Sequence, residues 1–244
     1  MKKIFTLTLL LAIAFVANAQ TKKVSILGDS YSTYKGYIPD NYAPFYPDAN
    51  NDVKDVEQMW WSLYIKAKGY ELEKNGSWGG TTICGTGYGR MDSSKSAFTS
   101  RVDLLGSPDI IFVFGGTNDY GHGDAPFGTF EDRTNDTFMG ACHFLFSGLV
   151  KKYPDARIVV MTPLQTSYDQ NLSANTGRPL IDYVDAIIAV AAHYSLPVLD
   201  LYRTAGICPR IEEHIPRYMP DGLHPNDAGH ARIAQKLIGF LRTL

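Results

Sequence analysis

Two short motifs in the sequence combine residue types that could perform acyl transfer. Gly28-Asp29-Ser30 follows an apolar run, and a Ser on a tight turn after a strand presents its hydroxyl as a nucleophile beside backbone N–H groups. Asp221-Gly222-Leu223-His224 places a carboxylate three residues before an imidazole, a pair that can shuttle a proton and fix the His tautomer. Each motif taken alone also fits an ordinary turn or helix cap.

Two further motifs could supply donors to a developing oxyanion. Gly115-Gly116-Thr117-Asn118-Asp119 follows 109–114, the strongest central-strand run of the sequence, and the Asn118 amide is a donor of the kind worth about 3 to 4 kcal/mol in acyl transfer. The segment 75–82 contains Gly79 and Gly80, and a Gly N–H is open to close approach by a substrate. Alone, the first of these motifs also fits a cap or Asx-turn, and the second fits a flexible loop.

The Asp-x-x-His spacing occurs three times. Asp227 and His230 stand at the start of the last predicted helix, where such a pair favours capping. Asp119 and His122 directly follow the candidate donor Asn118 and form the rival relay pair. The position of Asp221 and His224 between the last predicted strand and the last predicted helix makes this pair the preferred relay.

The elements that must position these motifs alternate along the chain. Apolar, β-branched runs predict strands, and segments with a helical period predict helices between them. The predicted strands are 24–28, 70–74, 109–114, 156–161 and 197–201, and the predicted helices are 58–68, 97–105, 137–152, 180–193 and 227–241.

This alternation predicts an α/β fold with a parallel sheet covered on both sides. Two long connections, 32–56 and 120–135, follow predicted strands. Ligands of open parallel sheets bind beyond the carboxyl ends of the strands, so we expect the chemistry there.

In their order and location these motifs resemble the SGNH hydrolases, also called GDSL esterases and lipases. Tyr31 stands where that family's first block usually has Leu, and Gly80 is the best match to its Gly block, with Gly79 as the alternative. The resemblance implies a three-layer α/β/α sandwich of flavodoxin-like type with five parallel strands. It also implies ester hydrolysis through an acyl-enzyme without a metal or cofactor.

The resemblance further implies a role for each matching residue. Ser30 is the expected nucleophile, His224 the general base and then acid, and Asp221 the residue that orients it. The expected oxyanion donors are the backbone N–H groups of Ser30 and Gly80 and the Asn118 side chain. Neighbouring residues are expected to contact substrate: Asp29, Tyr31, Trp78, Asp119 and His122.

The N-terminus has the pattern of a secretory signal peptide. Lys2 and Lys3 precede an apolar run, and Ala17-Asn18-Ala19 provides a small-x-small cleavage site. We expect residues 1–19 to be removed and residues 20–244 to form one secreted or periplasmic catalytic domain. A retained membrane anchor is the alternative. No later stretch is apolar and long enough to span a bilayer.

Charge and cysteine content limit the partners and cross-links. The formal net charge of −2 provides no basic field for nucleic acid or an anionic membrane. Export makes disulfides possible. Cys142 has the pattern of a buried helical residue, which leaves a bridge between Cys84 and Cys208 as the candidate.

The substrate class is suggested by aromatic residues in the loop after Ser30. Tyr and Phe side chains alternate with Pro residues there, and aromatic faces beside a nucleophile suit stacking on sugar rings. The hypothesis is a carbohydrate O-acetylesterase that acts on plant or host glycans, with peptidoglycan also compatible. The alternatives are a lysophospholipase or thioesterase, a secreted glycan-binding module without catalysis, and aromatics that only pack the loop onto the domain.

Overall fold

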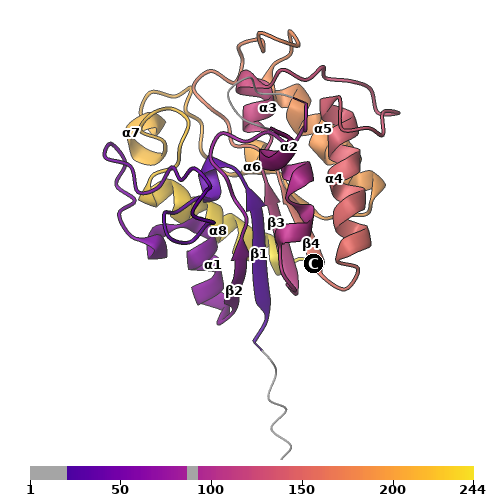
Figure 1. Ribbon diagram of the computed structural model, residues 1–244. Helices are drawn as coiled ribbons and strands as arrows, with labels where there is room; N and C mark the ends of the chain where they lie inside the picture. Colours follow the sequence, from indigo (N-terminus) through magenta and orange to yellow (C-terminus); the bar gives the residue numbers. More distant parts are fainter. Residues whose placement is uncertain (1–20, 87–92) are drawn as a thin grey trace, which may run out of the picture.

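A five-stranded parallel sheet forms the centre of the computed structural model, which describes residues 21–86 and 93–244 (Figure 1). The order β2-β1-β3-β4-β5 and the parallel pairing of every neighbour confirm the predicted sheet. The expected signal peptide, 1–19, lies outside the described residues. The strands are β1 (Lys23–Gly28), β2 (Glu71–Asn75), β3 (Ile110–Phe114), β4 (Arg157–Met161) and β5 (Val198–Leu199).

Helices cover both faces of the sheet and complete three layers. Figure 1 shows α1 and α8 on one face and α4 and α5 on the other, each layer over its own buried apolar cluster. All five residues of β3 are buried, because this central strand is covered from both sides. The helices are α1 (Trp60–Lys68), α2 (Ser93–Ser96), α3 (Thr117–His122), α4 (Phe138–Lys152), α5 (Leu180–His193), α6 (Leu201–Thr204), α7 (His214–Tyr218) and α8 (Asp227–Leu241).

The fifth strand is shorter than the sequence predicts. β5 covers only Val198–Leu199 because the side chain of Asp200 accepts a hydrogen bond from the Arg203 N–H and caps α6. The helix therefore begins at Leu201, which the sequence assigned to the strand. An N-capping carboxylate ends the strand here although its apolar run continues.

The helix predicted over 97–105 is wrong. Two short 3₁₀ turns, Phe98–Ser100 and Val102–Leu104, occupy this segment. Their three-residue spacing turns the side chains of Phe98 and Arg101 to the same buried side, where the guanidinium lies 4.7 Å from the centre of the Phe98 ring. Arg101 points inward because it donates to distant segments of the chain, and such contacts cannot be predicted from helical periodicity.

The predicted disulfide is also wrong, because all three cysteines are free. The thiol of Cys84 is buried and donates to the Asn135 carbonyl at 3.3 Å. Burial raises its pKa to about 11 and keeps it protonated. Cys142 is fully buried on α4, as its helical pattern predicts.

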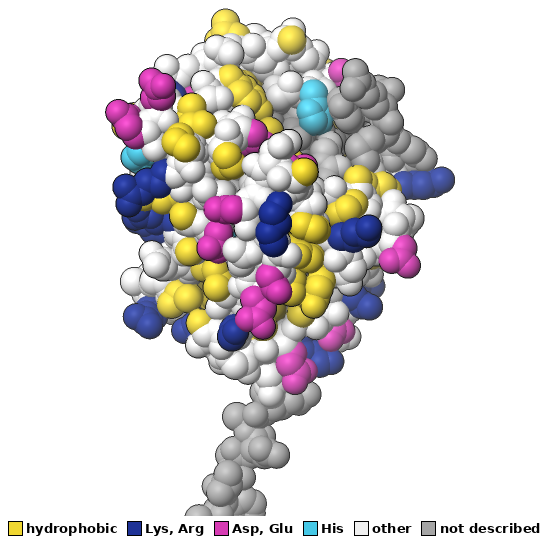
Figure 2. Space-filling model, turned by 90° about the vertical axis from the view of Figure 1, so that its left-hand side faces the viewer, with side chains coloured by type: hydrophobic (Ala, Val, Ile, Leu, Met, Phe, Trp, Pro, Cys, Tyr) yellow, Lys and Arg dark blue, Asp and Glu magenta, His cyan; other side chains and the backbone are white. Residues whose placement is uncertain are grey.

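The outer surface carries no large field of one sign on the face shown in Figure 2, where acidic and basic side chains are interspersed with apolar ones. This agrees with the formal net charge of −2. Among the described residues, no helix combines the length and the apolar character that crossing a membrane requires.

Candidate active site

Ser30 lies directly beyond the carboxyl end of β1, in a 3₁₀ turn over Ser30–Ser32. The Asp29 carboxylate caps this turn by accepting the Tyr31 N–H at 3.1 Å. Gly28 permits the close packing of the turn, since a Cβ there would lie 2.7 Å from the Ser77 hydroxyl oxygen. The Ser30 side chain consequently reaches a cavity of about 460 Å³ at the carboxyl edge of the sheet.

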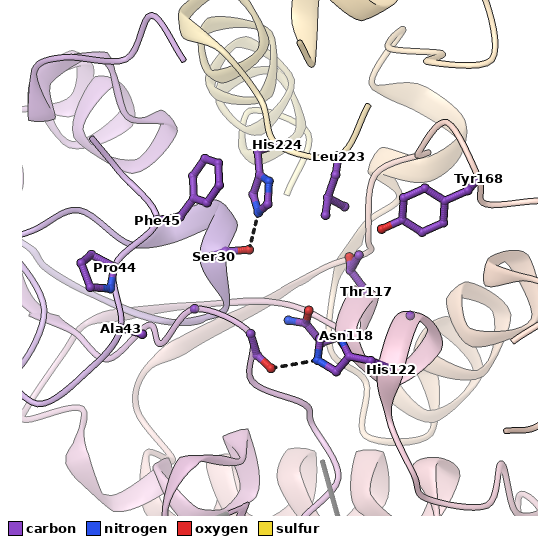
Figure 3. Close-up of a pocket in the computed structure, with 13 residues that line it drawn as sticks. Ser30, Ala43, Pro44, Phe45, Thr117, Asn118, His122, Tyr168, Leu223 and His224 are labelled. Atoms are coloured by element: carbon purple, nitrogen blue, oxygen red, sulfur yellow. Dashed lines mark hydrogen bonds between the residues drawn. The ribbon is translucent and has the colours of Figure 1, made fainter. Parts of the chain in front are cut away.

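The structure brings Ser30, His224 and Asp221 into one hydrogen-bonded chain (Figure 3). His224 Nε2 is 2.9 Å from Ser30 Oγ, and its Nδ1 is 2.7 Å from Asp221 Oδ2. An ionised carboxylate can only accept, so Nδ1 carries the proton and Nε2 accepts from the serine hydroxyl. This is the tautomer in which imidazole can act as a general base towards Ser30.

Asp221 is held ionised by the turn that contains it. Partial burial raises the pKa of this carboxyl, but hydrogen bonds from the His224 side chain and from backbone N–H groups outweigh burial and leave the pKa below its usual value. The backbone donors are the N–H groups of Leu223 and His224, at 2.9 and 2.6 Å. Gly222 has φ +75 and lies close to Ser167, so the turn requires glycine there.

The rival Asp-His pairs are not relays in this fold. The Asp119 carboxylate accepts the backbone N–H groups of Ile83 and Cys84 and is buried. Burial raises its pKa to about 7 although these N–H donors act in the opposite direction. His122 instead places Nε2 3.1 Å from the Gly80 carbonyl oxygen.

His230 is fully buried on α8, away from any carboxylate relay. Its Nδ1 accepts the Trp60 N–H at 3.3 Å. Burial, together with the nearby His224, lowers its pKa to about 3, so this imidazole is neutral at ordinary pH. Its place is therefore structural, between α1 and α8.

Gly80 and Asn118, the two expected donors outside the Ser30 turn, line the cavity beside Ser30. The Gly79 N–H is occupied by the Ala43 carbonyl at 2.8 Å, whereas the N–H of Gly80 meets no acceptor among the described residues. The Asn118 side chain uses one N–H on the Thr81 carbonyl at 3.0 Å, and the second N–H of the carboxamide remains for a substrate oxygen. Gly80, rather than Gly79, is therefore the available backbone donor.

Asn118→Ala is expected to lower kcat for p-nitrophenyl acetate by about 100-fold, because an oxyanion donor acts on the transition state more than on bound substrate. KM should change little. Thermal unfolding of the variant serves as the control, since the same side chain also bonds the Thr81 carbonyl. An unchanged kcat in a folded variant would assign Asn118 to loop structure alone.

A buried arginine joins the strand ends and loops that carry the site. Arg101 is fully buried and donates to the carbonyls of Gly28 and Gly76 and to the Thr81 hydroxyl. It also donates to the Ser96 carbonyl at 2.9 Å. Burial lowers its pKa to about 9, and within the described part of the chain no carboxylate forms an ion pair with it. Sequence reasoning missed Arg101, because no motif marks it.

Of the five residues predicted to contact substrate, only His122 lines the cavity. Asp29, Tyr31 and Asp119 are each at most 5% exposed, because they cap or pack the turns around Ser30. Trp78 stacks on Tyr42, with ring centres 4.0 Å apart and planes 16° apart. These four residues support the site and do not line it.

The aromatic loop after Ser30 mostly packs onto the domain. Tyr34, Tyr42 and Tyr46 are at most 9% exposed, so the predicted row of sugar-stacking faces is not present. Phe45 lines the cavity, but its ring lies against His224. Sequence reasoning gave no cavity role to several other lining residues, although Thr117 and Leu223 belong to the quoted motifs: Ala43, Pro44, Thr117, Gly121, Tyr168 and Leu223.

Comparison with known proteins places this geometry in a family. A family model described as GDSL-like lipase/acylhydrolase matches residues 22–204, a span that contains Ser30 and Asn118 and ends before Asp221. The comparison with curated proteins found no match.

Solved structures share both the fold and part of the sequence. A protein described as a GDSL-like lipase from Bacteroides ovatus is 32% identical with TM-score 0.73, the match covering 92% of this chain and 99% of that one. Another from Bacteroides uniformis is also 32% identical with TM-score 0.73, covering 92% and 97%. The chain therefore belongs to the GDSL-like lipase/acylhydrolase family, whose members are ester-hydrolysing serine hydrolases.

Proposed function

We propose that Ser30, His224 and Asp221 hydrolyse carboxylic esters through an acyl-enzyme, and that O-acetylated glycans outside the cytoplasm are the substrate class. The observation that carries the proposal is the hydrogen-bonded chain from Asp221 to Ser30, which opens into a cavity beside two free N–H donors. Secretion is proposed from the N-terminal sequence pattern.

Each group has a defined part in the reaction. Ser30 Oγ attacks the ester carbonyl carbon while His224 Nε2 takes the hydroxyl proton. The carbonyl oxygen becomes an oxyanion and accepts hydrogen bonds from the Ser30 and Gly80 N–H groups and from Asn118. The tetrahedral intermediate then releases the alcohol, which takes the proton from His224. Water, deprotonated by His224, attacks the acyl-enzyme; the second tetrahedral intermediate then expels Ser30 Oγ, which takes that proton back from His224, and the acid is released.

The cavity favours a short acyl group on a polar alcohol. Its lining combines the imidazole of His122 and the ring and hydroxyl of Tyr168 with small residues such as Ala43 and Gly121. Figure 3 shows Tyr168, from the loop after β4, and His122, from the end of α3, on the side of the cavity across from Phe45. An acetyl xylan esterase, 19% identical with TM-score 0.55, has the same fold, so such a substrate is compatible with this architecture.

A series of p-nitrophenyl esters from acetate to palmitate, measured beside acetylated xylan, tests the proposal. We expect kcat/KM to be highest for acetate and to fall with chain length, and we expect acetate release from the xylan. Each rate is compared with that of Ser30→Ala, which corrects for hydrolysis without the nucleophile. A preference for palmitate would reject the glycan proposal in favour of a lipid acylhydrolase.

A further inference from the structure

The imidazole of His224 lies flat against an aromatic ring. The ring centres of Phe45 and His224 are 3.5 Å apart, and their planes differ by only 14°. Tyr46 packs edge-on against the same phenyl ring, with centres 4.8 Å apart, and is itself fully buried. Phe45 is therefore supported from behind by the core while its face covers His224 (Figure 3).

The backbone ties Phe45 to the turn that carries Ser30. The Phe45 N–H donates to the Thr33 hydroxyl oxygen at 2.8 Å, and the same hydroxyl donates to the Ser30 carbonyl at 3.1 Å. Thr33 is fully buried. The phenyl ring and the Ser30 turn are thus fixed relative to each other through one side chain.

We propose that Phe45 is a positioning residue that holds the His224 imidazole in line with Ser30 and stabilises the positive charge this imidazole carries after it takes the serine proton. The inference rests on the proposed function of His224. An aromatic face attracts a cation close to its centre, and the interaction is stronger where water is excluded. The face is used in the transition state, because neutral imidazole gains less from it.

None of the other described groups around His224 covers the face of its imidazole as Phe45 does. Asp221 occupies Nδ1 and Ser30 occupies Nε2, so both ring nitrogens are used. Tyr31 approaches the imidazole only edge-on, with ring centres 5.9 Å apart and planes at 79°. His230, on α8, is neutral and contributes no opposing charge. Among the described residues, Asp221 is the one carboxylate bonded to His224, and it fixes the edge of the ring but not its face.

The test uses two substitutions that remove the aromatic face, Phe45→Leu and Phe45→Met, and one that keeps it, Phe45→Tyr. The first two are expected to lower kcat by about 3- to 30-fold with KM within about twofold, since a cation–aromatic contact is of this strength. The acidic limb of kcat/KM should move to lower pH by about half a unit to one unit, because the protonated imidazole loses stabilisation. Phe45→Tyr should retain the wild-type limb.

Tyr37→Leu is the matched control, because Tyr37 lies in the same loop, is 46% exposed and contacts Trp61 rather than His224. It should leave kcat and the pH profile unchanged. The inference would be overturned if Phe45→Leu or Phe45→Met, unfolding at the wild-type temperature, raised KM but left kcat and the acidic limb unchanged. Phe45 would then only form a wall of the cavity. Failure of the proposed function is separate: it would appear as full activity in Ser30→Ala.

Discussion

Ser30→Ala is expected to lower kcat/KM for p-nitrophenyl acetate by about 10⁴-fold or more, because the variant has no nucleophile to form the acyl-enzyme. The residual rate comes from the oxyanion donors and from substrate binding alone. The Ser30 side chain is partly exposed at the cavity and the substitution removes only its hydroxyl, so the thermal unfolding temperature should stay close to that of the wild type. Initial rates over a range of substrate concentrations measure the effect.

His224→Ala and His122→Ala, compared side by side, decide which imidazole serves Ser30. His224→Ala should lose about as much activity as Ser30→Ala, and the double variant of Ser30 and His224 should lose no more, since the two residues act as a unit. His122→Ala should lose about tenfold or less, the value of one hydrogen bond to the Gly80 carbonyl. The reverse order of losses would assign the relay to His122.

Arg101→Leu is expected to reduce the free energy of unfolding by about 3 kcal/mol, because it leaves several buried acceptors without their donor. The guanidinium serves the carbonyls of Gly28, Gly76 and Ser96 at the ends of separate segments. Urea unfolding measures the loss. Activity assayed where the variant is folded should fall too, because Gly28 and Gly76 flank the turns of Ser30 and Gly80.

Arg178→Leu provides the same substitution at an exposed position. Arg178 forms an i,i+4 ion pair with Asp182, and its side chain is 47% exposed. Surface ion pairs contribute about 1 kcal/mol or less, so the free energy of unfolding should change little. Equal losses in the two variants would show that burial of Arg101 adds nothing to stability.

The regular elements were largely predictable from hydrophobic pattern. The run 109–114 is apolar throughout because β3 is covered on both faces, and the helix predicted over 180–193 has the bounds of α5. Errors occurred where tertiary contacts override local pattern. The segment 97–105 folds as 3₁₀ turns around an inward Arg101, and β5 ends early at the Asp200 cap.

The site divides in the same way. The Asp221-x-x-His224 spacing predicts a local turn. That turn is present, because its hydrogen bonds join residues only three positions apart. Most of the residues expected to contact substrate do not line the cavity: Asp119 accepts backbone N–H groups, and Trp78 stacks on Tyr42. The direction in which a side chain points cannot be predicted from its closeness to a motif in the sequence.

By itself the sequence determined the parallel α/β architecture, the motifs in chain order and the preferred residues of the relay. Those properties follow from periodicity and from spacings of a few residues, which local physics sets. Only the tertiary structure placed His224 against Ser30 across 194 positions, chose Gly80 over Gly79, and laid the Phe45 ring on the imidazole. Such contacts depend on how distant segments pack, because packing and not spacing decides which side chains share a cavity.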